Sequence, residues 1–257
     1  MLPNFLKFLL PSLLCFNIWN NPPVQKLVWS EEFNYKGLPN KAVWSYDEGT
    51  GCPKICGWGN NELEYYTSGN KENVFVQNGV LKITALRKDI ETSKYSSARI
   101  VSKNKIAFKY GKIECRAKLP TTKGTWPAFW MLGANFDKAG WPACGEIDIM
   151  EHKGNDLNTI YSTLHYPEYF GGNANGDTLK IKNVNAFHIY SVIWNEKSIT
   201  FFVDNKQIHT VENNASLPFN QDFYFIVNLA IGGNFAGDVD ESLTKESMEV
   251  DYIRVYQ

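Results

Sequence analysis

Residues 145–152 read Gly-Glu-Ile-Asp-Ile-Met-Glu-His, and the rest of the chain can be organised around them. Glu146 and Asp148 are two residues apart, so a β-strand would point both carboxylates to one face. Glu151 follows Glu146 by five residues, an odd separation that would place it on the opposite, apolar face. A β-bulge at about Met150 adds one residue and returns Glu151 to the acidic face, whereas a helix would turn positions i and i+5 roughly 140° apart. The spacing therefore predicts a bulged strand with three acids on one face.

Three carboxylates on one face repel one another, so at least one should keep its proton to a higher pH than usual. Two carboxyl groups with separated pKa values can supply the nucleophile and the proton donor that cleave a glycosidic bond. The acids alone are equally compatible with a calcium site or a solvated acidic strand face. Other parts of the sequence have to decide between these interpretations.

The chain has 257 residues and no visible linker or repeat, which suits one large β-sandwich domain, expected over residues 22–257. Its formal net charge is −1 and its Lys and Arg residues are scattered, so it lacks the basic surface typical of a nucleic-acid-binding protein. Aromatic residues are plentiful, with 8 Trp, 13 Tyr and 16 Phe. Many of the Trp residues adjoin Gly, Pro or Asn, a placement more typical of a cleft than of a uniform core.

Residues 1–21 have the composition of a secretory signal peptide. They are rich in Leu and Phe, contain one charged side chain, Lys7, and include an apolar run over 8–18 that is too short to span a bilayer. No A-x-A cleavage site is visible, and Cys15 offers a lipoprotein alternative that the large Leu14 before it disfavours. We therefore expect a protein that is secreted, periplasmic or held at the cell surface, without a transmembrane anchor.

Cysteine spacing allows one local disulfide. Cys52 and Cys56 lie in the loop sequence Cys-Pro-Lys-Ile-Cys, close enough to bridge if the geometry allows it. Metal binding is not expected at this pair, because neither a second Cys pair nor a nearby His completes a site. Cys115 alternates with apolar neighbours and is expected in the core.

Short apolar or alternating runs follow one another along the chain, without long helical periodicity. Val74–Gln77 and Val80–Ala85 flank Asn78-Gly79, a dipeptide that tolerates positive φ at both positions and predicts a tight hairpin. The other expected strands begin in 26–34 or lie in 110–119, 126–132, the acid stretch, 159–165, 187–194, 198–203, 207–211, 223–230 and 248–256. About a dozen strands without helices predict an all-β fold of two packed sheets.

The acid stretch belongs to a longer motif that resembles a known enzyme signature. Gly140–Glu151 reads Gly-Trp-Pro-Ala-Cys-Gly-Glu-Ile-Asp-Ile-Met-Glu, which resembles glycoside hydrolase family 16. The extra residue before the last Glu is similar to the laminarinase branch of that family, the endo-β-1,3-glucanases. Further matching segments are 29–34, 59–67, 97–100, 126–132, 164–166, 228–234 and 250–257. The resemblance thus runs over most of the chain that follows the expected signal peptide.

The resemblance implies a concanavalin A-like β-jelly-roll sandwich of two curved antiparallel sheets, with the substrate in a groove on the concave face. It implies that Glu146 is the nucleophile, Asp148 its electrostatic helper and Glu151 the general acid/base of a retaining mechanism. Such a mechanism requires the two working carboxyl groups to be about 5–5.5 Å apart. A flat strand spaces its residues at ~3.3 Å each, so strand curvature and leaning side chains have to bring Glu146 and Glu151 together.

Three tryptophans are expected to offer flat faces to glucosyl rings in the groove: Trp126, Trp130 and Trp141. Core packing is the alternative for each, and it is strongest for Trp130, which lies between Phe129 and Met131. Trp126 and Trp141 adjoin Pro or Gly and are the better candidates. Trp58 is a weaker one.

Four polar residues match family positions in the substrate cleft. Asn60, Arg99 and Asn228 resemble positions that hydrogen-bond sugar hydroxyls, although Arg99 could instead pair with Glu64 or with the acid strand. His165 resembles a cleft residue near the leaving-group side, whereas a lone histidine is otherwise more often structural.

The resemblance also implies a structural calcium ion on the convex side of the sandwich. The matching positions are Glu32, the Gly79 carbonyl and Asp251, and oxygen ligands suit calcium. Asp251 alternates with the apolar Val250 and could simply face water. The ion would affect stability, and no cofactor is expected for catalysis.

The leading interpretation is a monomeric endo-hydrolase of laminarin-type β-1,3-glucan or mixed-linkage β-1,3/1,4-glucan. One alternative keeps the chemistry and changes the polymer to agarose or carrageenan, but sulfated polymers would need a basic cleft, for which only Arg99 and scattered Lys residues are visible. A second alternative is a β-glucan-binding protein that does not cleave. Such proteins typically lose the catalytic acids, and all three acids are present here.

Overall fold

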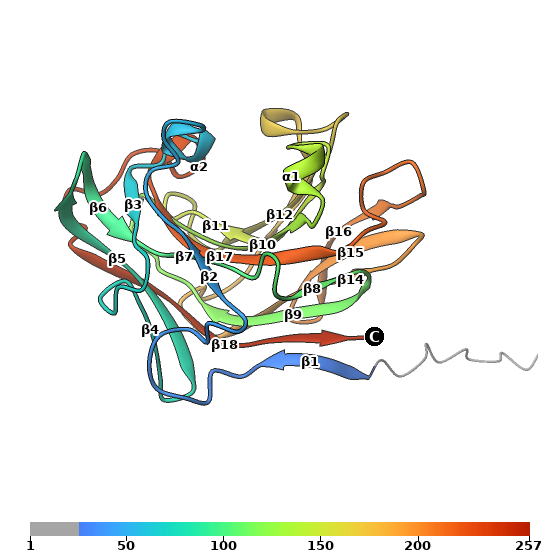
Figure 1. The fold of residues 1–257 in the computed structure, drawn as a ribbon, viewed down its shortest axis with the longest axis horizontal. Helices are drawn as coiled ribbons and strands as arrows, with labels where there is room; N and C mark the ends of the chain where they lie inside the picture. The colour runs from blue at the N-terminus through green and yellow to red at the C-terminus, as the bar shows by residue number, and fades with distance from the viewer. Residues whose placement is uncertain (1–25) are drawn as a thin grey trace, which may run out of the picture.

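The computed structural model describes residues 26–257, so the expected signal peptide and Cys15 lie outside the described residues. Within this range 18 strands form two sheets that stack face to face (Figure 1). The all-β sandwich predicted from the sequence is confirmed. No helix in residues 26–257 is both long and apolar enough to cross a membrane.

Ten strands form the sheet that we call the outer sheet. Its order is β16-β15-β14-β9-β18-β5-β6-β3, with β1 on β18 and β4 on β5. The strands are β1 (Leu27–Glu31), β3 (Glu64–Tyr66), β4 (Val74–Gln77), β5 (Val80–Ile90), β6 (Ser93–Ser97), β9 (Gly111–Lys118), β14 (His188–Trp194), β15 (Ser198–Val203), β16 (Lys206–Glu212) and β18 (Lys245–Tyr256). Pairing is antiparallel throughout these strands except between β3 and β6, which run parallel.

Eight strands form the sheet that we call the inner sheet. Its order is β13-β12-β11-β10-β17-β7-β2, with β8 on β17. The strands are β2 (Ser45–Asp47), β7 (Arg99–Val101), β8 (Ala107–Phe108), β10 (Thr125–Gly133), β11 (Glu146–His152), β12 (Thr159–His165), β13 (Asn175–Lys180) and β17 (Phe223–Ile231). The acid stretch is β11, near the middle of this sheet.

Four short helical segments stand at the ends of strands. They are η1 (Cys56–Gly59), α1 (Phe136–Ala139), η2 (Gly171–Asn173) and α2 (Gly233–Ala236). Each has three or four residues, too few to produce a helical period in the sequence. Helices α1 and α2 rise on the same side of the inner sheet, at opposite ends of it (Figure 1).

The main core lies between the two sheets and follows strand alternation. On β11 the side chains of Ile147 and Ile149 are fully buried, and on β9 those of Ile113 and Cys115 are buried in the same cluster, as predicted for Cys115. A second apolar cluster covers part of the other face of the inner sheet, at the α1 end; its buried members are Val101, Leu132, Cys144, Tyr224 and Ile226. The side of the inner sheet that faces away from the outer sheet therefore carries apolar groups at one end and the acids near its middle.

The predicted hairpin at Asn78-Gly79 is confirmed. Both residues have positive φ, 54° and 73°, and they connect β4 to β5 in the expected register. A two-residue turn with positive φ at both positions matches the right-handed twist of the strands that it joins.

Phe129 provides a test of the packing between the sheets. It is fully buried on β10, and its ring centroid lies 5.8 Å from that of Phe225. Replacing Phe129 with Ala should cost about 3–5 kcal/mol of unfolding free energy, because it leaves a cavity in the core. Guanidinium unfolding followed by Trp fluorescence measures this loss, with Leu157→Ala, at a side chain that is 51% exposed, as the control. A loss below ~1 kcal/mol for Phe129→Ala would contradict the packing described.

Candidate active site

The bulge predicted in the acid strand is present. On β10, Ala128 and Trp130 are two residues apart, and they oppose Glu151 and Asp148, which are three apart on β11. The extra residue turns Met150 into the core, where its side chain is fully buried. Glu151 therefore reaches the same face as Asp148, as the spacing predicts.

One row of opposed residues crosses the inner sheet at the position of Glu151. Directly opposed residues in a sheet project to the same face, so these side chains line a common track. From β12 to β2 the row consists of Tyr161, Glu151, Ala128, Asn228, Arg99 and Asp47. The small Ala128 leaves the floor open between Glu151 and Asn228. The pairing thus places two predicted sugar-binding residues, Asn228 and Arg99, in line with the predicted general acid.

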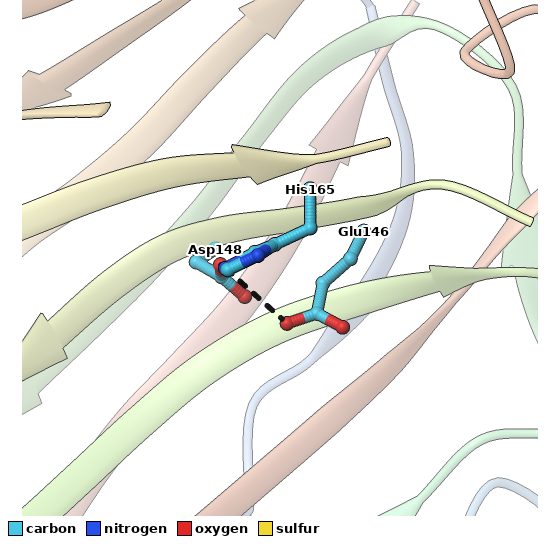
Figure 2. A group of neighbouring side chains, drawn as sticks. All are labelled: Glu146, Asp148 and His165. Carbon is cyan, nitrogen blue, oxygen red and sulfur yellow. Dashed lines mark ion pairs between the residues drawn. The ribbon is translucent and has the colours of Figure 1, made fainter. Parts of the chain in front are cut away.

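Glu146 lies at one end of β11, against an indole and an imidazole. Trp141 Nε1 donates a hydrogen bond of 2.8 Å to Glu146 Oε2, and His165 Nε2 lies 3.9 Å from Glu146 Oε1. The same His165 nitrogen is 3.2 Å from Asp148 Oδ2, so the three side chains converge (Figure 2). Asp148 is only 3% exposed, and its Oδ2 atom is buried without a hydrogen-bond partner among the described residues.

Glu151 has a separate indole partner. Trp126 Nε1 donates a hydrogen bond of 3.0 Å to Glu151 Oε1. The Trp126 ring packs on the Phe235 ring of α2, with 4.9 Å between the ring centroids. The Tyr161 ring packs edge-on against the same Phe235 ring, with 5.0 Å between the centroids. Each of the two glutamates is therefore positioned by its own tryptophan, and the two environments differ.

The three acids bind protons more tightly than carboxyl groups in water. Burial, reinforced by the charge of Asp148, raises the pKa of Glu146 to about 8, against the opposing effects of His165 and Trp141. Burial also raises the pKa of Glu151 to about 7; His165 opposes this rise and Glu146 adds to it. The pKa of Asp148 is raised by burial and by the charge of Glu151. A group with a pKa near 7 can donate and accept a proton near neutral pH, as a general acid/base must.

Glu146, Asp148 and His165 also bring three ligand atoms within 4.8 Å of one another, which raises the question of a metal. The Gly171 N–H donates to His165 Nδ1 at 3.2 Å, so Nδ1 accepts and a neutral ring carries its hydrogen on Nε2. A nitrogen that carries a hydrogen has no lone pair to offer a metal, so the cluster does not fit a metal site. His165 instead presents a donor to the acids.

Arg99 anchors the far end of the row. Its guanidinium carbon lies 4.7 Å from the Trp58 ring and 4.8 Å from the Trp130 ring, so the two indoles sandwich it. Its Nε pairs with Asp47 at 2.9 Å, which corrects the alternative pairings with Glu64 or the acid strand: Asp47 is the residue opposed to it on β2. Trp130 is half-buried and donates to Asn228 at 2.8 Å, so it faces the row rather than the core.

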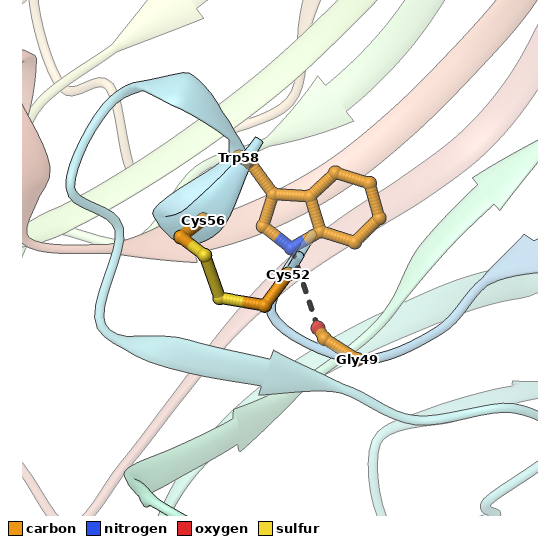
Figure 3. Close-up of a disulfide and its surroundings, with 4 residues drawn as sticks. All are labelled: Gly49, Cys52, Cys56 and Trp58. Carbon is orange, nitrogen blue, oxygen red and sulfur yellow. Dashed lines mark hydrogen bonds between the residues drawn. A yellow bond between two sulfur atoms is a disulfide. The ribbon is translucent and has the colours of Figure 1, made fainter. Parts of the chain in front are cut away.

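The Trp58 platform is held by a disulfide-closed loop. Cys52 and Cys56 form the bridge that their spacing allows, and Trp58 follows two residues later (Figure 3). Trp58 Nε1 donates to the Gly49 carbonyl at 3.3 Å, which ties the ring back to the start of the loop. The loop thus holds an aromatic face against Arg99 at the edge of the track.

Several residues around the site were not predicted from the sequence. Tyr161 and Phe235 pack beside Glu151, and Phe170 packs edge-on against Trp141 at 5.6 Å. Glu62 accepts a hydrogen bond from Asn60, and Tyr66 connects Glu62 to Asn228. The Asn-Glu-Leu-Glu-Tyr-Tyr motif at 61–66 contains Glu62 and Tyr66, but only their contacts distinguish them from their neighbours.

The positions predicted to bind calcium lie beside arginines. Both carboxylate oxygens of Glu32 accept hydrogen bonds of 2.9 Å from Arg254, and Asp251 pairs with Arg116. A carboxylate already neutralised by a guanidinium is a poor ligand for a cation, so these side chains do not fit calcium as they lie. The calcium site, with the Gly79 carbonyl as its third member, stays a prediction.

A two-sheet sandwich with paired, buried glutamates in a track of tryptophans and of polar groups predicted to bind sugar defines a glycoside hydrolase. The chain belongs to the glycosyl hydrolases family 16, whose sequence pattern matches residues 61–254.

Relatives agree with this assignment. The chain is 39% identical over 262 residues to a β-glucanase from Rhodothermus marinus. The aligned region covers 96% of this chain and 90% of the relative. The laminarinase catalytic domain from Thermotoga maritima MSB8 is similar in structure, with a TM-score of 0.85 and 42% identity over 91% of this chain and 98% of that one. The laminarinase from Flavobacterium sp. UMI-01 is also similar in structure, with a TM-score of 0.84 and 44% sequence identity. The match covers 90% of this chain and 100% of that one.

The raised pKa of Glu146 predicts a pH-dependent cost to stability. The folded state holds this proton up to a pH of about 8, whereas the unfolded chain releases it near 4.5, so Glu146 lowers stability as the pH rises through that window. Glu146→Gln should therefore have nearly the same Tm as wild type at about pH 4.5 and a Tm several degrees higher at about pH 8.5. Each kcal/mol of unfolding free energy corresponds to about 2–4 °C in Tm for a chain of this size. Thermal melts across this range, with Glu196→Gln at an exposed turn as the control, measure the difference. A difference that does not grow with pH would contradict the burial of this carboxyl group.

Proposed function

We propose that the chain is an endo-β-1,3-glucanase of the laminarinase type that retains anomeric configuration. The observation that supports this most is the bulged strand β11, which presents Glu146 and Glu151 to one track, each with its own tryptophan donor. The names of the similar proteins, β-glucanase and laminarinase, support the choice of substrate.

The first step forms a covalent sugar–enzyme bond at Glu146. The carboxylate of Glu146 attacks C1 of the glucosyl residue, the C1–O bond breaks, and Glu151 gives its proton to the departing oxygen. Glu146 accepts the Trp141 indole N–H, and this hydrogen bond and His165 lower the pKa of Glu146 against the effects of burial and of Asp148. In the free site the raised pKa of about 8 favours the protonated form of Glu146, so the attack requires the fraction of the enzyme in which Glu146 has released its proton.

The second step reverses the role of Glu151. It removes a proton from water, whose oxygen attacks C1 and displaces Glu146, so two inversions give net retention. Its pKa of about 7 suits both roles, because the group exchanges its proton readily near neutral pH.

Cleavage within a chain fits the position of the acids in the track. The row continues from Glu151 through Asn228 and Arg99 toward β2 and through Tyr161 toward β12, so sugar-binding groups are available on both sides of the acids. The charge of Arg99 is taken up by Asp47, which leaves the track with a surplus of acidic groups. A neutral glucan suits such a surface better than a sulfated polymer does.

The substrate and the nucleophile are tested together by reducing-end release from laminarin, mixed-linkage glucan, agarose and carrageenan. Wild type should act on laminarin, and Glu146→Gln should lose on the order of 10³-fold or more of that activity, because the amide cannot attack C1. Phe129→Leu, a core substitution outside the track, serves as the matched control. Laminarin that is bound but not cleaved by wild type would contradict the hydrolase and favour a glucan-binding protein, and activity on agarose or carrageenan alone would contradict the substrate.

The proton donor is tested by the leaving group. Glu151→Gln should slow laminarin cleavage by roughly 10²–10⁴-fold, because a sugar alkoxide leaves poorly without a proton. An aryl β-laminaribioside with a nitrophenolate leaving group needs little protonation, so its first step should be slowed much less. Burst kinetics on both substrates separate the two effects. Equal losses on both would contradict the role of Glu151 as general acid.

We also propose that the protein is exported, with residues 1–21 as its signal peptide. The Cys52–Cys56 disulfide supports this, because such bonds persist mainly in oxidising compartments outside the cytosol. N-terminal sequencing of the protein from its native source would settle the cleavage site and decide whether Cys15 carries a lipid.

A further inference from the structure

A chain of hydrogen bonds fixes the carboxylate of Glu62 beside the track. Asn60 Nδ2 donates to Glu62 Oε1 at 3.0 Å, and the Tyr66 hydroxyl donates to Glu62 Oε2 at 3.2 Å. Asn228 Nδ2 donates to the Tyr66 hydroxyl at 3.0 Å, and Trp130 Nε1 donates to Asn228 Oδ1 at 2.8 Å. Every donor in this chain points toward Glu62, so the chain favours a negative charge there.

Glu64 lies behind Glu62 and has a different environment. Its side chain is fully buried; Oε2 accepts the Ile231 N–H at 2.6 Å, and Oε1 has no hydrogen-bond partner among the described residues. Burial, and next the charge of Glu62, raise the pKa of Glu64 well above its usual value. Burial of Glu64 therefore favours its protonated form, and the hydrogen-bond donors around Glu62 favour a carboxylate there.

Two paths connect Glu62 to the general acid/base. Through Tyr66 it holds Asn228, which opposes Ala128, the direct neighbour of Glu151 in the row. On the other side, Glu62 pairs with Gly232 at the start of the α2 turn. Phe235 of that turn packs on Trp126, the donor to Glu151. Glu62 is thus built into both walls of the site that contains Glu151.

We propose that Glu62 is a positioning residue for Glu151: its fixed negative charge holds the proton on Glu151 until the leaving oxygen takes it. This role rests on the proposed function, in which Glu151 is the general acid/base. Glu146 also favours the proton on Glu151, but its charge disappears when it bonds to the sugar. Glu62 takes no part in that bond, so it keeps Glu151 basic enough to activate water in the second step.

Other groups face Glu151, and the charge of Glu62 acts alongside them. Glu146 and Asp148 lie on the same strand, Tyr161 and His165 come from β12, Trp126 comes from β10, and Lys153 lies over Tyr161 and Phe235. Of these, Glu146 raises the pKa of Glu151 together with Glu62, whereas His165 and the Trp126 hydrogen bond lower it. The effect of Glu62 is therefore a partial one that a single substitution can measure.

The direct test is a carboxyl ¹³C NMR titration of Glu151, assigned by its absence in Glu151→Gln. In Glu62→Gln the midpoint of Glu151 should fall by about half a pH unit, the order expected for removal of one charge across a partly hydrated groove. Glu62→Asp keeps the charge and should restore most of the midpoint. Glu72→Gln, at an exposed ion pair with Lys88, should leave it unchanged. An unchanged midpoint in Glu62→Gln would overturn the proposal.

Kinetics give the second readout. In Glu62→Gln the alkaline limb of the pH profile of kcat/KM on laminarin should move to lower pH by the same half unit. In Tyr66→Phe, which keeps the charge of Glu62 and removes the hydrogen bond to Asn228, the limb should stay in place. Tyr66→Phe should instead raise KM. A wild type that cleaves no glucan while Glu62→Gln still moves the midpoint would contradict the proposed function and leave the charge effect standing. Loss of activity in Glu62→Gln at every pH, with no movement of limb or midpoint, would show a purely structural role and overturn the proposal.

Discussion

The extra residue in β11 is the constraint on which the site depends. A strand alternates its side chains between two faces, so without the bulge Glu151 would point into the core and the apolar Met150 would point toward the track. With the bulge, Ile147, Ile149 and Met150 fill the core, and three acids share the opposite face. Packing and chemistry are thus satisfied by one irregularity, and the neighbouring strands β10 and β12 both shift their pairing to accommodate it.

Burial sets the proton affinities, and hydrogen bonds then make the two glutamates different. Desolvation raises the pKa of each acid, which alone would leave all three protonated and inert. Separate indole donors from Trp126 and Trp141, together with His165, oppose this rise at Glu151 and Glu146. The cost of burying carboxyl groups is accepted at this site because a dry, fixed arrangement stabilises the charge that develops in the transition state.

The fold and the catalytic strand were predictable because they follow simple periodicities. The expected strands at 159–165 and 198–203 coincide with β12 and β15, and the odd spacing of Glu151 was sufficient to predict the bulge. Strand β13 was missed because Asn-Gly-Asp-Thr-Leu-Lys has almost no apolar alternation; it lies at the edge of the sheet, where little burial is required. The partner of Arg99 and the roles of Glu62 and Tyr66 were missed for another reason: they depend on pairings between distant segments, which no local pattern encodes.

The central claim is that Glu146 forms a covalent bond with the sugar. An activated 2-deoxy-2-fluoro-β-laminaribioside tests it most directly, because the fluorine slows both steps and the good leaving group lets the first one proceed, so the intermediate accumulates. Peptide mass spectrometry should then find the fluorosugar on Glu146, within the peptide that contains β11. A label on Glu151 or Asp148, or turnover to a product of inverted configuration without any label, would contradict the account.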